Sequence, residues 1–214
     1  MKIVPVIGEV MGKRAPLVCI TGPSGAGKTH FSNHLAAQLR SSGIRPVVIA
    51  SDDYYRQHWT PDSIYGFDTV DAIDSEALIS ELSSLQAGRL QCRRRYDMGT
   101  REVRWEPLNA SWDVVLLEGA FGPQLLTDHS SPQLLIYVET MLAIRVMRRL
   151  RRDVRERQRS TTSVLRQMMI NMLPGERRFI RPLKDAADLV VMDIQTGLTS
   201  AQSQIQDLLI PCRD

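Results

Sequence analysis

The chain has 214 residues, 43% of them hydrophobic, which is enough to fill the core of one domain. No apolar run approaches the roughly 18 residues of a membrane span, and the N-terminal segment lacks a signal-peptide layout, so we expect a cytoplasmic protein with no membrane partner. Three scattered cysteines fit a reduced compartment, and a net charge of +3 is too mild to indicate nucleic-acid binding by itself.

Apolar runs alternate with helix-period segments along the chain, the pattern of a parallel sheet covered by helices on both faces. In the first half, Ile3–Ile7 is a candidate edge strand or part of a hairpin. Leu17–Thr21 and Pro46–Ala50 are predicted strands rich in apolar residues. The helix between them runs from Thr29 to Leu39, with apolar side chains on one face. A second helix starts near Ser75, a good N-cap.

The second half of the chain continues the alternation and completes a doubly wound α/β domain. An arginine-rich helix is followed by a methionine-rich one, which Pro174-Gly175 should stop. The expected strands and helices, in chain order, lie at Val114–Leu117, Leu134–Val138, Leu142–Arg157, Thr162–Leu173, Leu189–Met192 and Thr199–Leu209.

Residues 22–29 read Gly-Pro-Ser-Gly-Ala-Gly-Lys-Thr, the G-x-x-x-x-G-K-[ST] pattern of a phosphate-binding loop. A strand precedes the loop and a helix follows it, so backbone N–H groups and the positive end of a helix dipole would face one anion. Lys28 would then reach the β- and γ-phosphates of ATP, and Thr29 would ligate Mg²⁺. The alternative is an ordinary glycine-rich turn. The candidate ATP-binding residues here are Gly22, Ser24, Gly25, Ala26, Gly27, Lys28 and Thr29.

Carboxylates follow two of the predicted strands, at the edge where parallel sheets bind ligands. One of Asp52 and Asp53 is placed to accept a proton from an attacking hydroxyl; the alternative is a residue that caps the next turn. Glu118 is placed to hold Mg²⁺ or its water shell, and its alternative is a solvated loop residue. Thr29, Glu118 and Asp52 are therefore the candidate metal ligands.

Eight arginines lie between Arg145 and Arg159, in a stretch that Asp153 and Glu156 interrupt. Guanidinium groups suit phosphate oxygens and transition-state charge, whereas the alternative for many of them is a solvated helix face. Nucleic-acid binding is the weaker interpretation, because aromatic residues are not interleaved with the arginines and the rest of the chain is nearly balanced in charge. We therefore expect no nucleic-acid partner.

From about Leu17 to Val191 these blocks resemble the uridine kinase (uridine–cytidine kinase) family, within the wider group that includes phosphoribulokinase. The resemblance implies a P-loop NTPase fold with a five-stranded, mainly parallel sheet, helices on both faces and an arginine-rich helical lid. It implies one kinase domain over 1–214, with an acceptor-site insertion at about 54–110 and the lid at about 145–165. The matching blocks are the phosphate loop, Asp52–Arg56, Phe67–Asp74, Tyr96-Asp97, Glu118-Gly119 and Arg148–Arg159 continuing to Gln167.

The resemblance also implies roles for single residues. Asp52 would be the catalytic base, acting with Lys28. Asp68 would bind the sugar hydroxyls of the acceptor, and Tyr96 would line the nucleoside site. By the same match, the acceptor would be contacted by Arg149, Arg159 and Gln167, and the ATP phosphates by Arg152 and Arg157.

The sequence departs from the family pattern at positions that, in the family, contact the pyrimidine base of the acceptor. Met98 stands where an aromatic residue is usual, and Arg101 stands where a histidine contacts the pyrimidine. An arginine at that position favours an anionic group such as a carboxylate or a phosphate.

We therefore expect an ATP- and Mg²⁺-dependent kinase acting on a small hydroxyl-bearing substrate, with uridine or cytidine as the first candidate acceptors. The alternatives are another acceptor, such as a sugar phosphate or a vitamin precursor, and an ATP-binding regulatory protein without transferase activity. Because uridine kinases commonly assemble as oligomers, the resemblance also implies a homo-oligomer.

Overall fold

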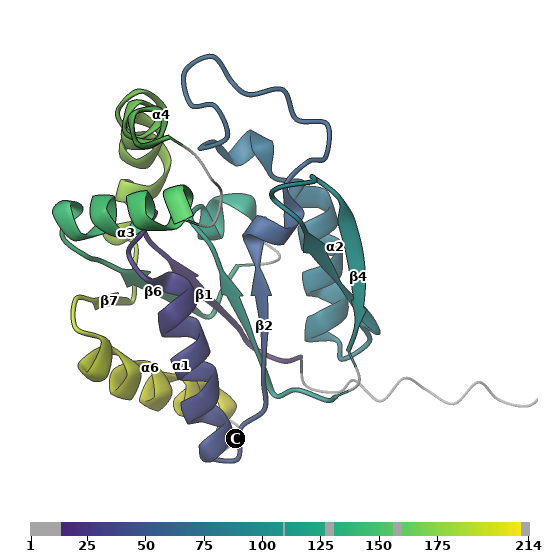
Figure 1. The fold of residues 1–214 in the computed structure, drawn as a ribbon. Helices are drawn as coiled ribbons and strands as arrows, with labels where there is room; N and C mark the ends of the chain where they lie inside the picture. Colours follow the sequence, from purple (N-terminus) through teal and green to yellow (C-terminus); the bar gives the residue numbers. More distant parts are fainter. Residues whose placement is uncertain (1–13, 109, 127–130, 156–159, 211–214) are drawn as a thin grey trace, which may run out of the picture.

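A five-stranded parallel sheet forms the centre of the molecule (Figure 1). The structure is a computed structural model that describes residues 14–108, 110–126, 131–155 and 160–210, so the candidate strand Ile3–Ile7 lies outside the described residues. The strand order is β2-β5-β1-β6-β7, and each neighbouring pair runs parallel. The α/β class and the five predicted strands are confirmed. The strands are β1 (Leu17–Thr21), β2 (Pro46–Ala50), β5 (Val114–Glu118), β6 (Leu134–Val138) and β7 (Leu189–Val191).

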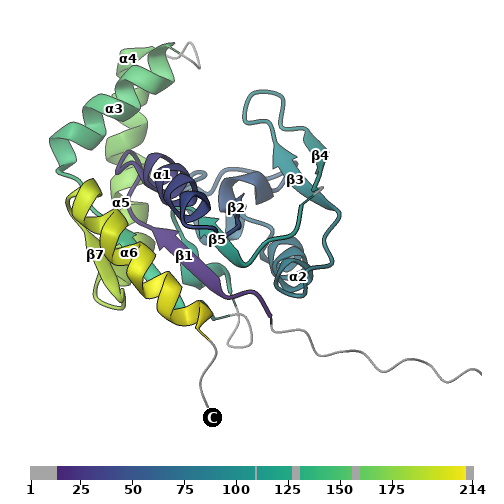
Figure 2. The same cartoon turned by 90° about the horizontal axis from the view of Figure 1, so that it is seen from below.

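Alternate residues of β1 pack into two different apolar cores, because successive side chains of a strand point to opposite faces of the sheet. Leu17 and Cys19 belong to one core, Val18 and Ile20 belong to the other, and all four are fully buried. Burial of each leucine or isoleucine side chain stabilises the fold by about 1.5–3 kcal/mol. The first core is covered by α2 (Ser75–Gln86), and the second by α1 (Lys28–Ser41) and α6 (Ile194–Leu209) (Figure 2).

The N-cap of α2 is Asp74 and not the predicted Ser75. The Oδ1 atom of Asp74 accepts a hydrogen bond from the backbone N–H of Ala77 at 3.2 Å. Ser75 is the first helical residue, so its hydroxyl lies one position too late to cap the first turn. The helix therefore begins where it was predicted to begin, but a neighbouring carboxylate satisfies its free N–H groups.

Helix α6 begins at Ile194, earlier than the predicted Thr199. The side chain of Asp193 caps it by accepting a hydrogen bond from a first-turn amide at 2.9 Å. The sequence did not predict this first turn because the turn contains Gly197, and glycine is a weak helix former. In the fold a Cβ atom at Gly197 would overlap the side chain of Val191, so helix and sheet approach each other closely there. Among the described residues, no helix is both long and apolar enough to cross a membrane.

A two-stranded antiparallel hairpin stands apart from the main sheet and was not predicted. Its strands are β3 (Cys92–Tyr96) and β4 (Val103–Pro107). Ion pairs hold it: Glu106 accepts from Arg93 at 2.8 Å and from Arg95 at 3.0 Å. The strand signal was missing because β3 is largely charged and its side chains are half-buried or exposed, with no apolar alternation.

Helices α3 (Leu142–Arg155) and α4 (Thr161–Gln167) lie across the carboxyl edge of the sheet (Figure 1). The prediction that Pro174-Gly175 ends the second of these helices was wrong. The backbone stays helical through wide π turns on both sides of the proline, and their longer hydrogen-bond spacing accommodates a residue without an N–H. The continuing segments are Met168–Met172, α5 (Leu173–Gly175) and Glu176–Ile180.

Gly175 is required by a close contact and not by its backbone conformation. Its φ of −60° and ψ of −43° are ordinary helical values that any residue can adopt. A Cβ atom at this position would overlap the carbonyl oxygen of Asp68. The glycine therefore lets the segment that carries Asp68 lie directly against the helix.

We predict that Gly175→Ala lowers the free energy of unfolding by about 1–3 kcal/mol, the usual cost of overpacking, although alanine is the better helix former. Urea denaturation of the variant measures this change. Ser203→Ala, at an exposed position in α6, is the control and should leave the stability equal or slightly higher. An equal or higher stability of Gly175→Ala would show that the Asp68 segment moves away without cost.

Candidate active site

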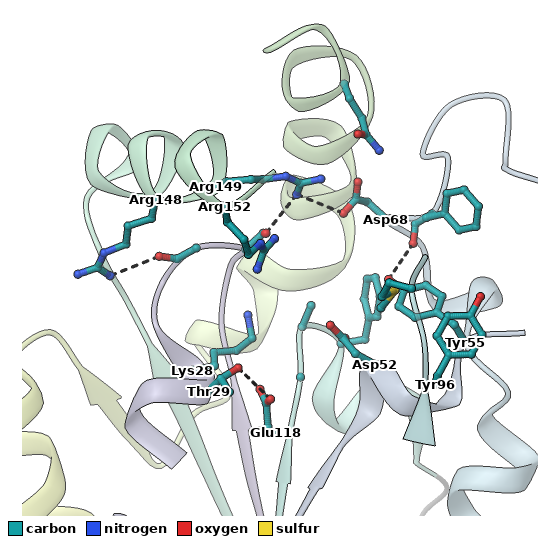
Figure 3. Close-up of a pocket in the computed structure, with 18 of the residues that line it drawn as sticks. Lys28, Thr29, Asp52, Tyr55, Asp68, Tyr96, Glu118, Arg148, Arg149 and Arg152 are labelled. Atoms are coloured by element: carbon teal, nitrogen blue, oxygen red, sulfur yellow. Dashed lines mark hydrogen bonds and ion pairs between the residues drawn. The ribbon is translucent and has the colours of Figure 1, made fainter. Parts of the chain in front are cut away.

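A cavity of about 870 Å³ opens at the carboxyl edge of the sheet (Figure 3). Its walls come from the phosphate loop, the ends of β2 and β5, the hairpin, the segment around Asp68, and helices α3 and α4. It brings together most of the predicted site residues. They are Ser24, Gly25, Gly27, Lys28, Thr29, Asp52, Asp68, Tyr96, Arg101, Glu118, Arg149, Arg152 and Gln167.

The phosphate loop takes the shape that its glycines permit. Gly25 and Gly27 have φ values of +78° and +98°, a region that residues with a Cβ rarely adopt. Gly27 leads into α1, so the N-terminal N–H groups of that helix face the cavity. The Lys28 ammonium donates to the carbonyl oxygens of Gly22 and Pro23, at 2.9 and 3.1 Å. Burial lowers the pKa of Lys28, while the charges of Glu118 and Asp52 oppose that shift.

Two predicted residues of the loop, Gly22 and Ala26, are not among the residues that line the cavity. A Cβ atom at Gly22 would overlap the carbonyl oxygen of Val138, so its role is a close approach to β6. Ala26 is buried, and its carbonyl oxygen accepts a hydrogen bond from the Thr140 hydroxyl at 2.9 Å. Both residues support the conformation of the loop through contacts outside the cavity.

Thr29 and Glu118 form the candidate metal site. The Thr29 hydroxyl donates to Oε1 of Glu118 at 2.9 Å, and Glu118 is 8% exposed. Burial raises the pKa of Glu118, the charge of Asp52 raises it further, and the charge of Lys28 opposes the shift. A buried carboxylate next to a hydroxyl is an oxygen donor set that fits Mg²⁺.

The described residues hold no cluster of three or more histidine, cysteine, aspartate or glutamate side chains that could bind a metal by themselves. Mg²⁺ usually takes one or two protein ligands and completes its shell with water and substrate phosphates. The sparse donor set at Thr29 and Glu118 therefore agrees with Mg²⁺ held together with a nucleotide.

Asp52 and Asp53 are adjacent in sequence but face different partners. Asp52 lines the cavity between the phosphate loop and the hairpin (Figure 3). Asp53 binds the hairpin, because its Oδ2 accepts from Arg95 at 2.8 Å and its Oδ1 accepts from the backbone N–H of Tyr96 at 3.1 Å. Asp52 therefore lies at the cavity, whereas Asp53 is bonded to the hairpin.

Arg149 connects the phosphate loop to the predicted acceptor site. Its Nη1 atom donates to the Ser24 hydroxyl at 3.1 Å and lies 3.8 Å from Oδ1 of Asp68 (Figure 3). Its Nε atom lies 3.6 Å from the fully buried carboxylate of Asp153. Burial raises the pKa of Asp68, and the Arg149 charge opposes that shift. The Oδ2 atom of Asp68 is buried without a hydrogen-bond partner among the described residues, so an acceptor hydroxyl would satisfy it.

The remaining described arginines of α3 have different surroundings. Arg145 is buried and makes a bidentate ion pair with Glu176, at 2.6 and 2.9 Å, so its role is structural. Arg152 lines the cavity and pairs with Asp153 at 3.3 Å. Arg148 also lines the cavity and lies 3.4 Å from two carbonyl oxygens of the phosphate loop; it was not predicted as a site residue. Predicted Arg157 and Arg159 lie outside the described residues.

Aromatic rings form the hairpin side of the cavity. Tyr55 lies between two of them, with ring centroids 6.3 Å from Phe67 and 6.0 Å from Tyr96. The guanidinium of Arg101 lies over the Phe67 ring, 5.0 Å from its centroid. Met98 lines the same wall and is 41% exposed. Tyr55 and Phe67 stood inside matching sequence blocks, but nothing in the sequence indicated that their rings would meet.

Comparisons with known proteins identify the family to which the chain is similar. A family model described as Phosphoribulokinase / Uridine kinase family matches residues 17–200. A uridine kinase of Limosilactobacillus reuteri (strain DSM 20016) is 30% identical over 213 residues, covering 92% of this chain and 94% of the relative. A uridine kinase of Staphylococcus aureus (strain JH9) is 30% identical over 188 residues, covering 84% and 88%.

Solved structures share the fold. A protein described as a possible uridine kinase from Bacillus stearothermophilus superposes with a TM-score of 0.61 at 20% identity, covering 85% of this chain and 91% of that one. A D-glycerate 3-kinase from Cryptococcus neoformans superposes with a TM-score of 0.57 at 14% identity, covering 82% of each chain.

We predict that Glu118→Gln is more stable than the wild type at neutral pH when nucleotide and divalent cations are absent. Because burial raises the pKa of Glu118 in the folded state, the wild type loses stability as pH rises from the ordinary carboxyl pKa through the raised one. The neutral amide avoids that loss, and its oxygen can still accept from Thr29. Urea denaturation across a pH series should show a gain at pH 7 that shrinks below about pH 4. A variant that is less stable at every pH would contradict this account.

Proposed function

The chain belongs to the phosphoribulokinase / uridine kinase family, and we propose that it transfers the γ-phosphoryl group of ATP to a hydroxyl group of a small molecule. One observation carries the proposal: a single cavity holds Lys28, Thr29 and Glu118 on its phosphate-loop side and Asp52 and Asp68 toward the acceptor (Figure 3). A site that only binds a nucleotide does not require the two acceptor-side carboxylates, Asp52 and Asp68.

The donor half uses positioning and charge. The N–H groups at the start of α1 and the Lys28 ammonium hold the β- and γ-phosphates, and Lys28 exchanges its two carbonyl partners for phosphate oxygens. Thr29 and Glu118 hold Mg²⁺ directly or through water. When bound, the ion neutralises charge on the phosphates.

The acceptor half activates the attacking hydroxyl. Asp52 accepts its proton as the oxygen forms a bond to the γ-phosphorus and the bond from that phosphorus to the bridging oxygen of ADP breaks. Asp68 and Arg149 hold neighbouring hydroxyl groups of the acceptor, consistent with the unsatisfied Oδ2 atom of Asp68. Tyr96 and Gln167 line the same space. Most of the rate enhancement then comes from orientation and charge stabilisation.

We propose one kinase domain in which residues of about 54–110 form the acceptor side and residues of about 145–165 form a lid. Phe67, Asp68 and Tyr96 of the first segment line the cavity, as do Arg149 and Arg152 of the second. The lid arginines cover the transferring group and exclude water, which suppresses hydrolysis of ATP.

Uridine and cytidine are the first candidate acceptors, because relatives that match most of the chain are described as uridine kinases. A second class of acceptor is a sugar phosphate or a vitamin precursor, which the cation of Arg101 in the acceptor wall favours. A coupled assay of ADP release over nucleosides, sugar phosphates and vitamin precursors tests the proposal. ATP consumption that stays flat over the whole panel would favour an ATP-binding regulator instead.

We predict that Asp52→Asn keeps the affinity for ATP but lowers kcat at least about 100-fold, the usual scale for loss of a general base. The matched control is Asp53→Asn, whose single amide oxygen can still accept one of the two hydrogen bonds from the hairpin and whose turnover should fall less than about tenfold. Steady-state kinetics and nucleotide titration measure the two quantities. If the Asp53 variant loses more turnover than the Asp52 variant, the assignment of the base is wrong.

We predict that Lys28→Ala lowers kcat/KM for ATP at least about 100-fold, because the ammonium stabilises charge on the transferring phosphate. Folding should change little, within about 1 kcal/mol, because burial already disfavours the charged form of Lys28. Kinetics and urea denaturation of the same preparation separate the two effects. Lys184→Ala, which removes a lysine paired with Glu139, is the control and should keep full activity.

A further inference from the structure

We propose that the acceptor carries an anionic group, a carboxylate or a phosphate, and that Arg101 binds this group on the hairpin side of the cavity. The inference rests on the phosphoryl transfer proposed above and selects between its two acceptor classes. It assigns Arg101 as the residue that determines acceptor specificity.

The first argument is that Arg101 is left without a carboxylate partner while its neighbours are not. Each arginine within β3 and β4 pairs with a carboxylate. The pairs are Arg93 with Glu106, Arg94 with Asp74, Arg95 with Asp53 and Glu106, and Arg104 with Glu102. Within the described ranges of the chain, Arg101 makes no ion pair, and yet it lines the cavity. Because Arg101 is exposed, its guanidinium is accessible to the negative group of a ligand that enters the cavity.

The second argument is that the turn that carries Arg101 is held in one defined backbone conformation. Its backbone has a φ of +61°, a left-handed conformation that residues other than glycine rarely adopt. Its N–H donates to the carbonyl oxygen of Asp97 at 2.7 Å, and the Asp97 side chain accepts from the N–H groups of Gly99 and Thr100 at 2.7 and 3.0 Å. The turn therefore fixes the base of the Arg101 side chain.

The third argument is that the guanidinium is held against a ring and, within the described part of the chain, donates no side-chain hydrogen bond. The group lies over the Phe67 ring, 5.0 Å from the centroid, which orients it by a cation–π contact. A guanidinium on a ring face keeps its N–H donors in its own plane, where the two oxygens of a carboxylate or a phosphate can accept side by side. An anchored arginine loses less side-chain entropy when it binds such a group.

The other cationic side chains of the cavity already contact the phosphate loop or a carboxylate: Arg148 donates to carbonyl oxygens of the loop, and Arg152 pairs with Asp153. Arg149 lies against the carboxylates of Asp68 and Asp153 and contacts Ser24. Lys28 serves the phosphate loop. Asp97 also lines the cavity, but its Oδ1 atom is occupied by two backbone amides, and those hydrogen bonds lower its pKa. The anion therefore binds at Arg101, and the acceptor hydroxyl lies toward Asp52 and Asp68.

The experiment compares acceptors in matched pairs, with ADP release measured on the full chain. Each pair sets an anionic acceptor against its uncharged analogue: a hydroxy acid with its amide, and a pentose phosphate with the free pentose. Uridine and cytidine complete the panel. We expect the charged member of at least one pair to be preferred by at least about tenfold in kcat/KM, the effect of roughly 1.4 kcal/mol.

Variants then test the residue. Arg101→Gln should raise the KM of the charged acceptor at least about tenfold, with kcat within about threefold and the KM of ATP unchanged. Arg101→Lys should recover part of the loss because it keeps the charge. Arg104→Gln removes an exposed arginine that is paired with Glu102 and should behave as the wild type. Thermal melting confirms that each variant is folded.

Two results overturn the inference in different ways. If neutral acceptors, uridine and cytidine included, are used at least as efficiently as charged ones and Arg101→Gln changes no KM, the anionic acceptor is wrong while phosphoryl transfer stands. If no acceptor elicits ADP release from the wild type, the proposed transfer itself fails, and the acceptor inference fails with it.

Discussion

Lys28 and Glu118 bring opposite charges together at one edge of the sheet, where Glu118 is buried and Lys28 is half-buried. Burial disfavours the ionised form of each group, and each partly compensates the other. The fold tolerates this desolvation cost because the two charges lie at an edge of the sheet and not on its helix-covered faces. Helices cover both faces of the sheet, and the apolar side chains of its strands pack into two hydrophobic cores. The carboxyl edge is where charged groups can gather around a ligand, and the loops that carry Asp52, Asp68 and Arg101 are arranged around that edge.

Three arginines of α3 have different roles because their surroundings differ. Arg145 is buried, pairs with Glu176 and donates to the carbonyl oxygen of Ser24 in the phosphate loop at 3.4 Å. Arg148, three residues later, is exposed and reaches the carbonyl oxygens of the same loop. Arg149 is buried again but faces carboxylates from two different elements. Helical geometry alone separates these three roles, because consecutive side chains of a helix point in different directions.

The parts of the structure that could be predicted from sequence are those that depend on local pattern. β1, β2 and β6 have the predicted bounds because continuous apolar runs indicate strands buried on both faces. The phosphate loop was predictable because its glycines, lysine and threonine stand at fixed spacing. The β3–β4 hairpin was missed because its stability comes from cross-strand ion pairs and from Asp53, which is far away in sequence. Gly175 was misread because its contact with Asp68 joins distant parts of the chain.

One guanidinium contacts both halves of the cavity. Arg149 donates to Ser24 of the phosphate loop and faces Asp68 of the acceptor side. A nucleotide that draws Arg149 toward the loop changes the charge that an acceptor meets, and an acceptor that engages Asp68 changes the loop that a nucleotide meets. Thermodynamic linkage requires the two effects to be equal, so the factor by which one ligand alters the dissociation constant of the other is the same in either order of addition. Under the proposed function, the sharing of this single side chain would make the two binding equilibria interdependent without a long-range change of shape.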